Sequence, residues 1–459
     1  MRWAVLLLIT AASAGAALPA AEAPAAAPFD PSPYRAVAER IIQQATNQTL
    51  GFRRLERLCD TFGPRFSGTT NLEAALDWMV AELKRDGFDD VRTEPVPVPH
   101  WVRGKESLRV LEPYPRSLHV LGLGGTVATP MDGLTAEVLV VPSFADLATH
   151  ATEAKGKIIF YNFPYTGYGS GLPYRSRGAI EAAKVGAAAS LIRSLTPFSM
   201  QTPHTGMMRY DEGVPRIPQA AVSLEDALFI QRCHDRGERV VVCLQLGAQT
   251  LPDVLSRNVI AELAGREKPD EFLVLGGHTD SWDVGTGAMD DAGGCLAAWE
   301  AVRVLRELGL RPRRTVRLVL WVNEENGLRG ARAYRTNHVA ELARHSLAIE
   351  SDVGVFRPEG FSFDGSASAR QTLQAIAGLL AGLGASRVQP GEGAADTLPL
   401  AQAGVPVSEL LTEREKYFWF HHTAADTPDK LKPDEFNQCV AALAVVAYVV
   451  AEMPELLPR

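Results

Sequence analysis

The sequence predicts an α/β protein with a mixed, mostly parallel sheet flanked by helices. From residue 256 onward, short apolar runs alternate with helical patterns, which is typical of parallel strands covered by helices. Polar or acidic residues follow several of these runs, as expected where a parallel sheet collects reactive groups at one edge. The runs expected to form strands are 258–263, 272–275, 314–322, 346–350 and 405–411.

A chain of 459 residues is too long for one typical core. Short strands and turn residues dominate residues 118–251, which indicates a separate β-rich domain. We expect this domain to be inserted into a larger one formed by residues 30–117 and 252–459. The insertion also contains a helical pattern over 176–185. Its loop over 197–218, rich in Pro, Gly, Met and Thr, is either a lid or an exposed connection.

Before the insertion, helical spacing predicts one helix over 34–58 and another over 72–86, with Asn71 as the cap of the second. Residues 91–98 alternate like a strand, and their prolines place that strand at a sheet edge. The last apolar run, 439–451, is shorter than the roughly 20 residues that cross a membrane, so we expect a buried helix.

The N-terminus and the overall charge indicate where the protein works. Residues 1–23 have a basic start, an apolar run and small residues after it, which is the pattern of a secretory signal peptide. The mature chain is therefore expected to be secreted or periplasmic, with no membrane anchor. A net charge of −8 without a basic patch argues against nucleic acid or an anionic membrane as a partner.

The five cysteines are odd in number and scattered, so they do not indicate a disulfide scaffold. None stands in a Cys-x-x-Cys pair, and thiolate metal ligands are therefore not expected. Cys233 and Cys243 could pair in an oxidising compartment, but we expect them to be free.

The stretch from residue 272 to 291 organises the rest of the chain. A short strand ends in two glycines and His278, and Asp280 stands two residues further on, on the same side of an extended backbone. A glycine-rich loop then leads to Asp290 and Asp291, and a helical pattern follows as far as residue 308. Asp291 could simply cap that helix.

Three further acidic or histidine motifs follow predicted strands. They are Glu324-Glu325, Asp352, and the loop that contains Tyr417, His421, His422 and Asp426. Imidazole and carboxylate together suit zinc. Two metal ions close together need a shared ligand, and Asp290 can bridge them. His278 and Asp352 would complete one set of ligands, and Glu325 and His422 the other.

Two carboxylates remain beside this ligand set. Glu324 is placed to act as a base toward a bound water. Asp280 is placed to bind the second ring nitrogen of His278, as carboxylates behind metal-bound imidazoles do. Taken singly, each of these residues is more often a turn or capping residue. Their occurrence at successive strand ends favours the metal site.

Together these motifs resemble the co-catalytic dizinc aminopeptidase family. The matching features are His278-x-Asp280, Asp290-Asp291-Ala-Gly, Glu324-Glu325, Asp352 after the next strand, and His422-Thr-x-x-Asp426-Thr. The resemblance implies a phosphorylase/hydrolase-like fold, two Zn²⁺ ions per subunit on the five ligands, and Glu324 as general base. It also implies that residues 118–251 are a protease-associated domain, that the peptide bond after Asp290 is cis, and that the protein is a homodimer.

The chain departs from the family pattern at two places. Many members have Tyr immediately before the last metal-binding His, whereas His421 stands here. The group that stabilises the oxyanion is therefore either His421 or Tyr417. The segment 391–396 matches only with a small shift in length, and it places Asp396 near the amino group of the substrate.

These observations predict a secreted zinc-dependent exopeptidase that hydrolyses the peptide bonds of dipeptides or short peptides. One alternative is a binding protein or receptor that keeps the fold without catalysis. Another is a hydrolase that acts on a non-peptide amide.

Overall fold

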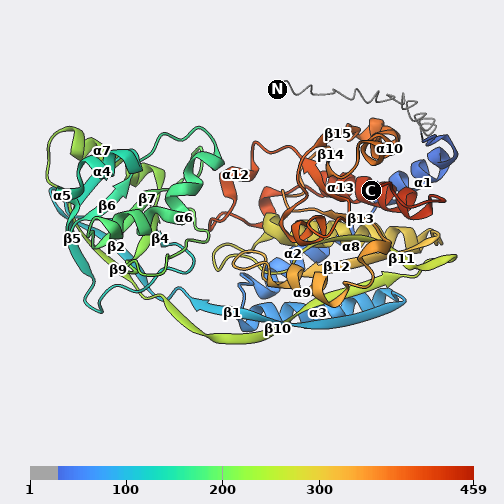
Figure 1. Ribbon diagram of the computed structural model, residues 1–459, viewed down its shortest axis with the longest axis horizontal. Helices are drawn as coiled ribbons and strands as arrows, with labels where there is room; N and C mark the ends of the chain where they lie inside the picture. The colour runs from blue at the N-terminus through green and yellow to red at the C-terminus, as the bar shows by residue number, and fades with distance from the viewer. Residues whose placement is uncertain (1–28, 199) are drawn as a thin grey trace, which may run out of the picture.

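The computed structural model describes residues 29–198 and 200–459 and contains two eight-stranded sheets (Figure 1). The signal peptide predicted over residues 1–23 lies outside the described residues. The mixed α/β class predicted from the sequence is confirmed. In order across the first sheet, the strands are β1 (Asp90–Val102), β10 (Gln249–Leu263), β12 (Arg314–Trp321), β11 (Lys268–His278), β13 (His345–Glu350), β16 (Val407–Thr412), β14 (Pro358–Asp364) and β15 (Arg387–Pro390).

The centre of the first sheet is parallel, since β11 pairs in parallel with β12 and β13, and β13 pairs in parallel with β16. Successive residues of these strands face opposite sides. Leu273 and Leu275 pack in a large core, whereas Val274 packs in a smaller one on the other face. The large core contains α1 (Arg35–Thr46), α2 (Leu50–Phe62), α3 (Thr70–Asp86), α8 (Gly293–Glu307) and α13 (Pro433–Glu452), and the small core contains α9 (Arg329–Asn337) and α11 (Leu398–Ala401).

The second sheet lies wholly between β1 and β10 in the chain. Its strands in order are β3 (Arg116–Leu118), β2 (Glu106–Glu112), β9 (Val241–Leu246), β5 (Leu134–Val141), β6 (Ile158–Tyr161), β7 (Ala189–Arg193), β8 (Gln219–Val222) and β4 (Val120–Gly122). It starts earlier than the predicted boundary at residue 118, because β2 follows β1 after only three residues and pairs with β9. The associated helices are α4 (Phe144–Thr149), α5 (Ala151–Ala154), α6 (Tyr168–Lys184) and α7 (Leu224–Asp235), so this part of the chain is mixed rather than mainly β.

A long two-stranded ribbon connects the two sheets (Figure 1). β1 pairs antiparallel with β10 from Asp90–Glu262 to Val102–Gln249, so the chain leaves and re-enters the first sheet along one path. As predicted from its prolines, β1 lies at the sheet edge. Beside the ribbon, Phe66 stacks on Trp282 at 4.8 Å, and Arg103 Nε donates to Asp283 Oδ2 at 2.8 Å. These contacts anchor the loop after His278 to the loop before α3, through Phe66, and to the residue that directly follows β1, Arg103.

Two predictions about the N-terminal helices were wrong in detail. The single helix expected over 34–58 is divided into α1 and α2 by a break at residues 47–49, because α1 packs mainly on α13 whereas α2 packs about equally on α8, on α3 and on residues 288–292. The cap of α3 is Thr69, whose Oγ1 accepts from Leu72 N at 3.3 Å. Asn71 instead donates to the backbone oxygen of Pro64.

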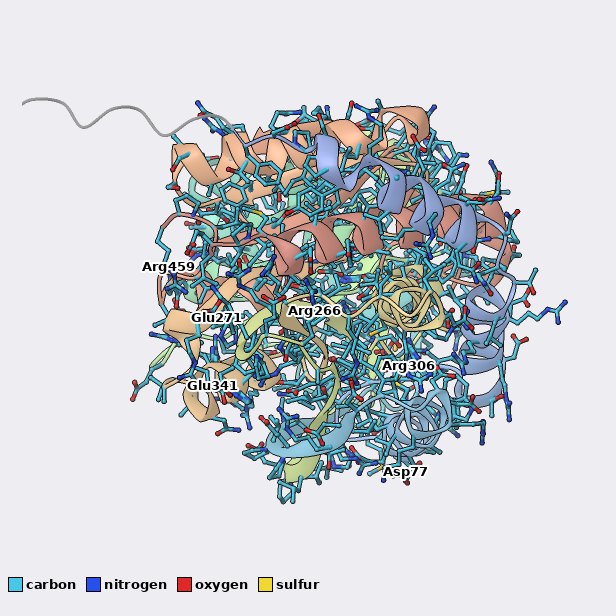
Figure 2. The ribbon with its side chains drawn as sticks, turned by 90° about the vertical axis from the view of Figure 1, so that its right-hand side faces the viewer. Asp77, Arg266, Glu271, Arg306, Glu341 and Arg459 are labelled. Carbon is cyan, nitrogen blue, oxygen red and sulfur yellow. The ribbon has the colours of Figure 1, made fainter. Side chains whose placement is uncertain are left out.

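The apolar run at the C-terminus forms α13, as predicted. Among the described residues, α13 is the one helix whose length and composition would suffice to cross a membrane, and most of it is buried in the large core. Figure 2 shows the end of the molecule away from the second sheet, where Arg266 pairs with Glu452 at the end of α13. Arg459 there donates to the backbone oxygens of Leu342 and His345, which anchors the chain end beside β13.

All five cysteines lie in the described part of the chain and are free, as expected.

A buried ion network joins α2, α3 and α8, and it leads to a prediction about stability. Arg54 is 6% exposed and donates to Glu82, Asp86 and Glu300 at 2.7–3.2 Å. Arg54→Ala removes a cationic partner from the buried carboxylate of Glu300, and a buried charge that loses a partner destabilises the fold. We therefore expect the free energy of unfolding to fall by about 3–5 kcal/mol in urea titrations. The control is Arg57→Ala on the same helix, whose side chain is 64% exposed. Equal effects of the two variants would contradict this account.

Candidate metal centre

The predicted ligands converge because of the way that the first sheet is built. β11 ends at His278, β12 ends three residues before Glu324, and β13 ends two residues before Asp352. After β16, the chain passes through the short helix α12 (Tyr417–Phe420) to His421 and His422. Since these four strands are parallel neighbours, their carboxyl ends meet at one edge of the sheet.

Asp290 lies at the centre of the cluster, with its two carboxylate oxygens directed to different groups. Oδ1 is 3.1 Å from His278 Nε2, which in turn is 3.1 Å from Asp352 Oδ1. Oδ2 is 3.2 Å from His422 Nε2, which is 3.1 Å from Glu325 Oε2. The structure thus brings the predicted residues together in two groups of three, here called the ligand groups, which share Asp290 and could each hold a metal ion.

The geometry and charge of this cluster fit zinc. Two ligands of one tetrahedral zinc, at bond lengths of about 2.0–2.1 Å, lie roughly 3.3 Å apart, which is close to the four distances above. Glu325 Oε1 is buried and has no hydrogen-bond partner among the described residues, which is unfavourable unless a cation binds it. Burial, together with the nearby charge of Asp290, raises the pKa of Glu325 to about 7.

Two other aspartates position the ligands. Asp426 accepts hydrogen bonds from the backbone N–H groups of Met289, at 2.8 Å, and Asp290, at 3.2 Å. Burial raises the pKa of Asp426 to about 7. Asp291 accepts from His278 N at 3.0 Å and from Gly294 N at 2.9 Å, so it positions a ligand as well as capping α8. The peptide bond between Asp290 and Asp291 is cis, as the family resemblance implied.

The contact expected between Asp280 and His278 is made differently. His278 Nδ1 lies 2.9 Å from the backbone oxygen of Asp280, whereas the carboxylate oxygen Oδ1 is 3.9 Å away. The carboxylate of Asp280 instead accepts from the backbone N–H groups of Glu324, at 3.1 Å, and Glu325, at 3.3 Å. Asn323 makes this possible, because its left-handed conformation, with φ of +67°, turns the chain after β12. Asp280 therefore positions the Glu324-Glu325 pair.

Glu324 lies on the wall of a cavity of about 200 Å³ and belongs to neither ligand group. Burial raises the pKa of Glu324 well above its usual range, and the charges of Asp352 and Glu325 add to this effect. A carboxylate with a raised pKa beside a metal cluster can accept a proton from a bound water and return it later.

Two of the three residues predicted to contact substrate lie on the cavity wall. Tyr417 and His421 line it, and the hydroxyl of Tyr417 donates to the backbone oxygen of Asp352 at 3.3 Å. Asp396 is fully buried instead, and its backbone N–H donates to Glu350 at 2.9 Å. Both carboxylate oxygens of Asp396 lack a hydrogen-bond partner in the described part of the chain.

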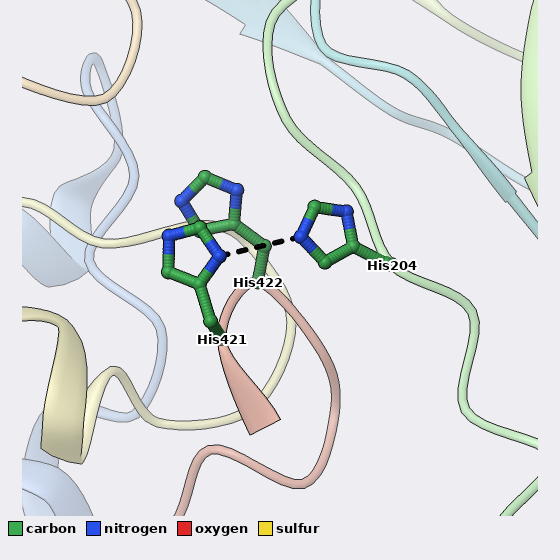
Figure 3. Close-up of side chains that lie close together, drawn as sticks. All are labelled: His204, His421 and His422. Carbon is green, nitrogen blue, oxygen red and sulfur yellow. Dashed lines mark hydrogen bonds between the residues drawn. The ribbon is translucent and has the colours of Figure 1, made fainter. Parts of the chain in front are cut away.

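A third histidine joins the last two ligand-loop histidines (Figure 3). The rings of His421 and His422 stack with centroids 3.6 Å apart, and His204 Nε2 is 3.3 Å from His421 Nδ1. His421 Nε2 is 3.2 Å from Asp290 Oδ2. Burial lowers the pKa of both His204 and His421 well below its usual value, so both rings are neutral. If His204 Nε2 donates to His421 Nδ1, the proton of His421 is on Nε2. That proton then faces the carboxylate of Asp290, whereas an unprotonated Nε2 would place its lone pair against the carboxylate oxygen.

Four residues near the cavity were missed in the sequence, and all come from the second sheet region. Tyr168, Arg175 and Met207 line the cavity, and His204 contacts it through His421. The only hint was a histidine within the Pro- and Gly-rich loop over 197–218. No spacing along the chain connects these residues with His278 or Asp290, because only the packing of the second sheet against α12 brings them there.

Comparison with known proteins agrees with this geometry. A family model described as Peptidase family M28 matches residues 258–447. Carboxypeptidase Q of Mus musculus is 48% identical over 430 residues, which cover 93% of this chain and 91% of that protein. A solved structure described as a peptidase M28 precursor from Shewanella amazonensis SB2B is 38% identical with a TM-score of 0.90, covering 93% of this chain and 99% of that chain. A zinc aminopeptidase from Bacillus subtilis, at 18% identity and a TM-score of 0.67 over 89% of this chain and 98% of that chain, shares the fold.

Proposed function

The chain belongs to peptidase family M28 and is a metallo-exopeptidase, and we propose that it hydrolyses dipeptides or short peptides with two zinc ions and with Glu324 as general base. The observation that carries this proposal is the position of Asp290 between two ligand groups, with the unliganded carboxylate of Glu324 on the adjoining cavity wall. His278, Asp290 and Asp352 would bind one ion, and Asp290, Glu325 and His422 the other.

The zinc ions, when bound, would lower the pKa of a water molecule and polarise the peptide carbonyl group. Glu324 accepts the proton of the attacking water and later donates it to the leaving nitrogen. His421 directs its Nε2–H toward the site, where it can donate to the carbonyl oxygen as negative charge develops. His204 keeps His421 in the required tautomer. The hydroxyl of Tyr417 is the other candidate donor. It donates to the backbone oxygen of Asp352, and the Nε2–H of His421 faces Asp290, so either group would exchange its present partner for the oxyanion.

Restriction to chain ends is expected from the groups that the cavity would offer to a free α-amino group. Its wall contains the carboxylates of Asp290, Glu324, Glu325 and Asp352. The two zinc ions would offset the charge of the three ligand carboxylates, which leaves the ions themselves and Glu324 to bind a free α-amino group. An internal peptide bond offers no such group.

We further propose that residues 118–251 form a protease-associated-like domain inserted into a catalytic domain of residues 30–117 and 252–459. The order of strands supports an insertion, although the second sheet itself begins at Glu106. Secretion or periplasmic export directed by residues 1–23, and assembly into a homodimer, are parts of the same proposal.

Removal of metal tests the function directly. The purified mature chain is expected to hydrolyse alanyl-leucine, to lose roughly 10³-fold in rate after treatment with a chelator, and to regain activity when zinc is added back. Product formation is followed by chromatography of the released leucine. Zinc binding without turnover of any dipeptide would indicate a binding protein on this fold. Turnover that survives complete loss of metal would exclude the proposed chemistry.

A further inference from the structure

Arg175 is the one arginine among the described residues that line the cavity, where acidic side chains and histidines predominate. Arg175 belongs to α6 of the second sheet region, and it lines the cavity together with Tyr168 and Met207. The remaining walls contain the carboxylates described above and the histidines of the ligand loop. Among the residues that line the cavity, the first sheet thus supplies the acidic side chains, whose charge the two zinc ions would offset, and the second sheet region supplies the one arginine.

The position of the Arg175 guanidinium is well defined. Its Nη1 donates to the hydroxyl of Tyr168, and its carbon Cζ lies 5.5 Å from the centroid of the same ring. Gly206 packs against it so closely that a Cβ there would lie 2.3 Å from Nη1. Tyr168 in turn stacks on Phe418 at 4.7 Å and contacts His421 edge-on at 5.1 Å. The guanidinium is thus coupled to the loop that contains the metal ligand His422.

Arg175 has no counter-ion within the described residues. No carboxylate forms an ion pair with it, and its Nε is buried without a hydrogen-bond partner. Arg177, two residues further along α6, forms surface ion pairs with Glu181 and Asp211 instead. A partly buried guanidinium without an anion is unfavourable, and it binds a carboxylate with paired, charge-assisted hydrogen bonds. The structure therefore provides an anion site inside the cavity.

We propose that Arg175, positioned by Tyr168, binds the free C-terminal α-carboxylate of a dipeptide substrate. The inference rests on the proposed exopeptidase function, in which the α-amino group binds at the zinc ions and Glu324. A dipeptide has its second charge at the opposite end, and a cavity of about 200 Å³ leaves room for little beyond a small ligand. Binding of both termini would place the single peptide bond between them, beside Glu324.

The test compares a free acid with the corresponding amide. For the zinc-loaded wild-type chain, kcat/KM for alanyl-leucine is expected to exceed that for alanyl-leucine amide by on the order of 10- to 100-fold, as expected for one hydrogen-bonded ion pair. Arg175→Gln should bring this ratio close to one, and Arg175→Lys should restore part of it. Arg177→Ala is the matched control on the same helix and should keep the full ratio. Thermal unfolding and zinc content show whether each variant is folded.

The outcomes separate this inference from the proposed function. Equal rates of the wild type on acid and amide, or an unchanged ratio in Arg175→Gln, would overturn the role of Arg175 while leaving the peptidase function intact. Failure of the wild type to hydrolyse either substrate would refute the peptidase function itself. A third comparison uses alanyl-glutamate amide. If the Arg175→Gln effect were confined to that substrate, the group bound would be a side-chain carboxylate, and the proposal would be wrong. If Arg175→Gln does not fold, Arg175→Met, which keeps the apolar stem, provides the same measurement.

Discussion

Replacement of Glu324 by Gln is expected to lower kcat by roughly 10²–10⁴-fold, the usual contribution of a general base, without loss of zinc. Glutamine has nearly the same shape, but its amide cannot accept and return a proton. Because Glu324 belongs to neither ligand group, the ions keep all of their protein ligands in this variant. The measurements are kcat on alanyl-leucine and the zinc content of the purified chain.

The same replacement at the neighbouring residue, Glu325, is the control for this prediction. Glu325→Gln changes a ligand, since Glu325 Oε2 lies 3.1 Å from His422 Nε2 in one of the two groups. This variant is expected to lose zinc from one site, whereas Glu324→Gln is not. Near-normal turnover in Glu324→Gln would exclude it as the base. Loss of zinc from Glu324→Gln would show that it is a ligand.

Replacement of Asp290 by Asn is expected to weaken binding of both ions at once, because Asp290 is the one residue that the two groups share. Activity should fall by about 10³-fold or more, since the metal contribution is worth several kcal/mol. A second readout does not depend on activity. Zinc raises the melting temperature of a protein that binds it only when folded, and this rise should be largely lost in Asp290→Asn.

Asp426→Asn tests a residue that positions a ligand of the site without belonging to either ligand group. Asp426 belongs to neither ligand group but accepts from the backbone N–H groups of Met289 and Asp290. A residue with such a supporting position typically contributes 10- to 100-fold to affinity or activity, so its effect should be smaller than that of Asp290→Asn.

If Asp290→Asn retained two zinc ions and the full thermal shift, the bridging role of Asp290 would be wrong.

The local patterns were sufficient to predict much of the fold and the two ligand groups. Alternating apolar runs and helical patterns identified the parallel sheet, and the groups at its carboxyl edge follow from that topology. The strand β11 ends at His278 and β13 ends two residues before Asp352, so the pairing of these strands brings the two side chains close together. For these residues, position relative to a strand end is a local property.

Other features depend on contacts between distant segments. The carboxylate of Asp280 binds the Glu324-Glu325 backbone and not His278, because Asn323 adopts a left-handed conformation that no spacing rule predicts. The break between α1 and α2 follows from the different helices on which they pack.

The order of the motifs along the chain was thus enough to identify the side chains that gather at the sheet edge. Hydrophobic periodicity and strand direction can be read from a few residues around each motif. The opposite wall of the cavity was not encoded in that way. Arg175 reaches it from α6 and His204 from a loop of the second sheet region, each more than 200 residues away from His421 in the chain. Their arrival depends on how the second sheet packs beside α12, which is a property of the whole folded chain.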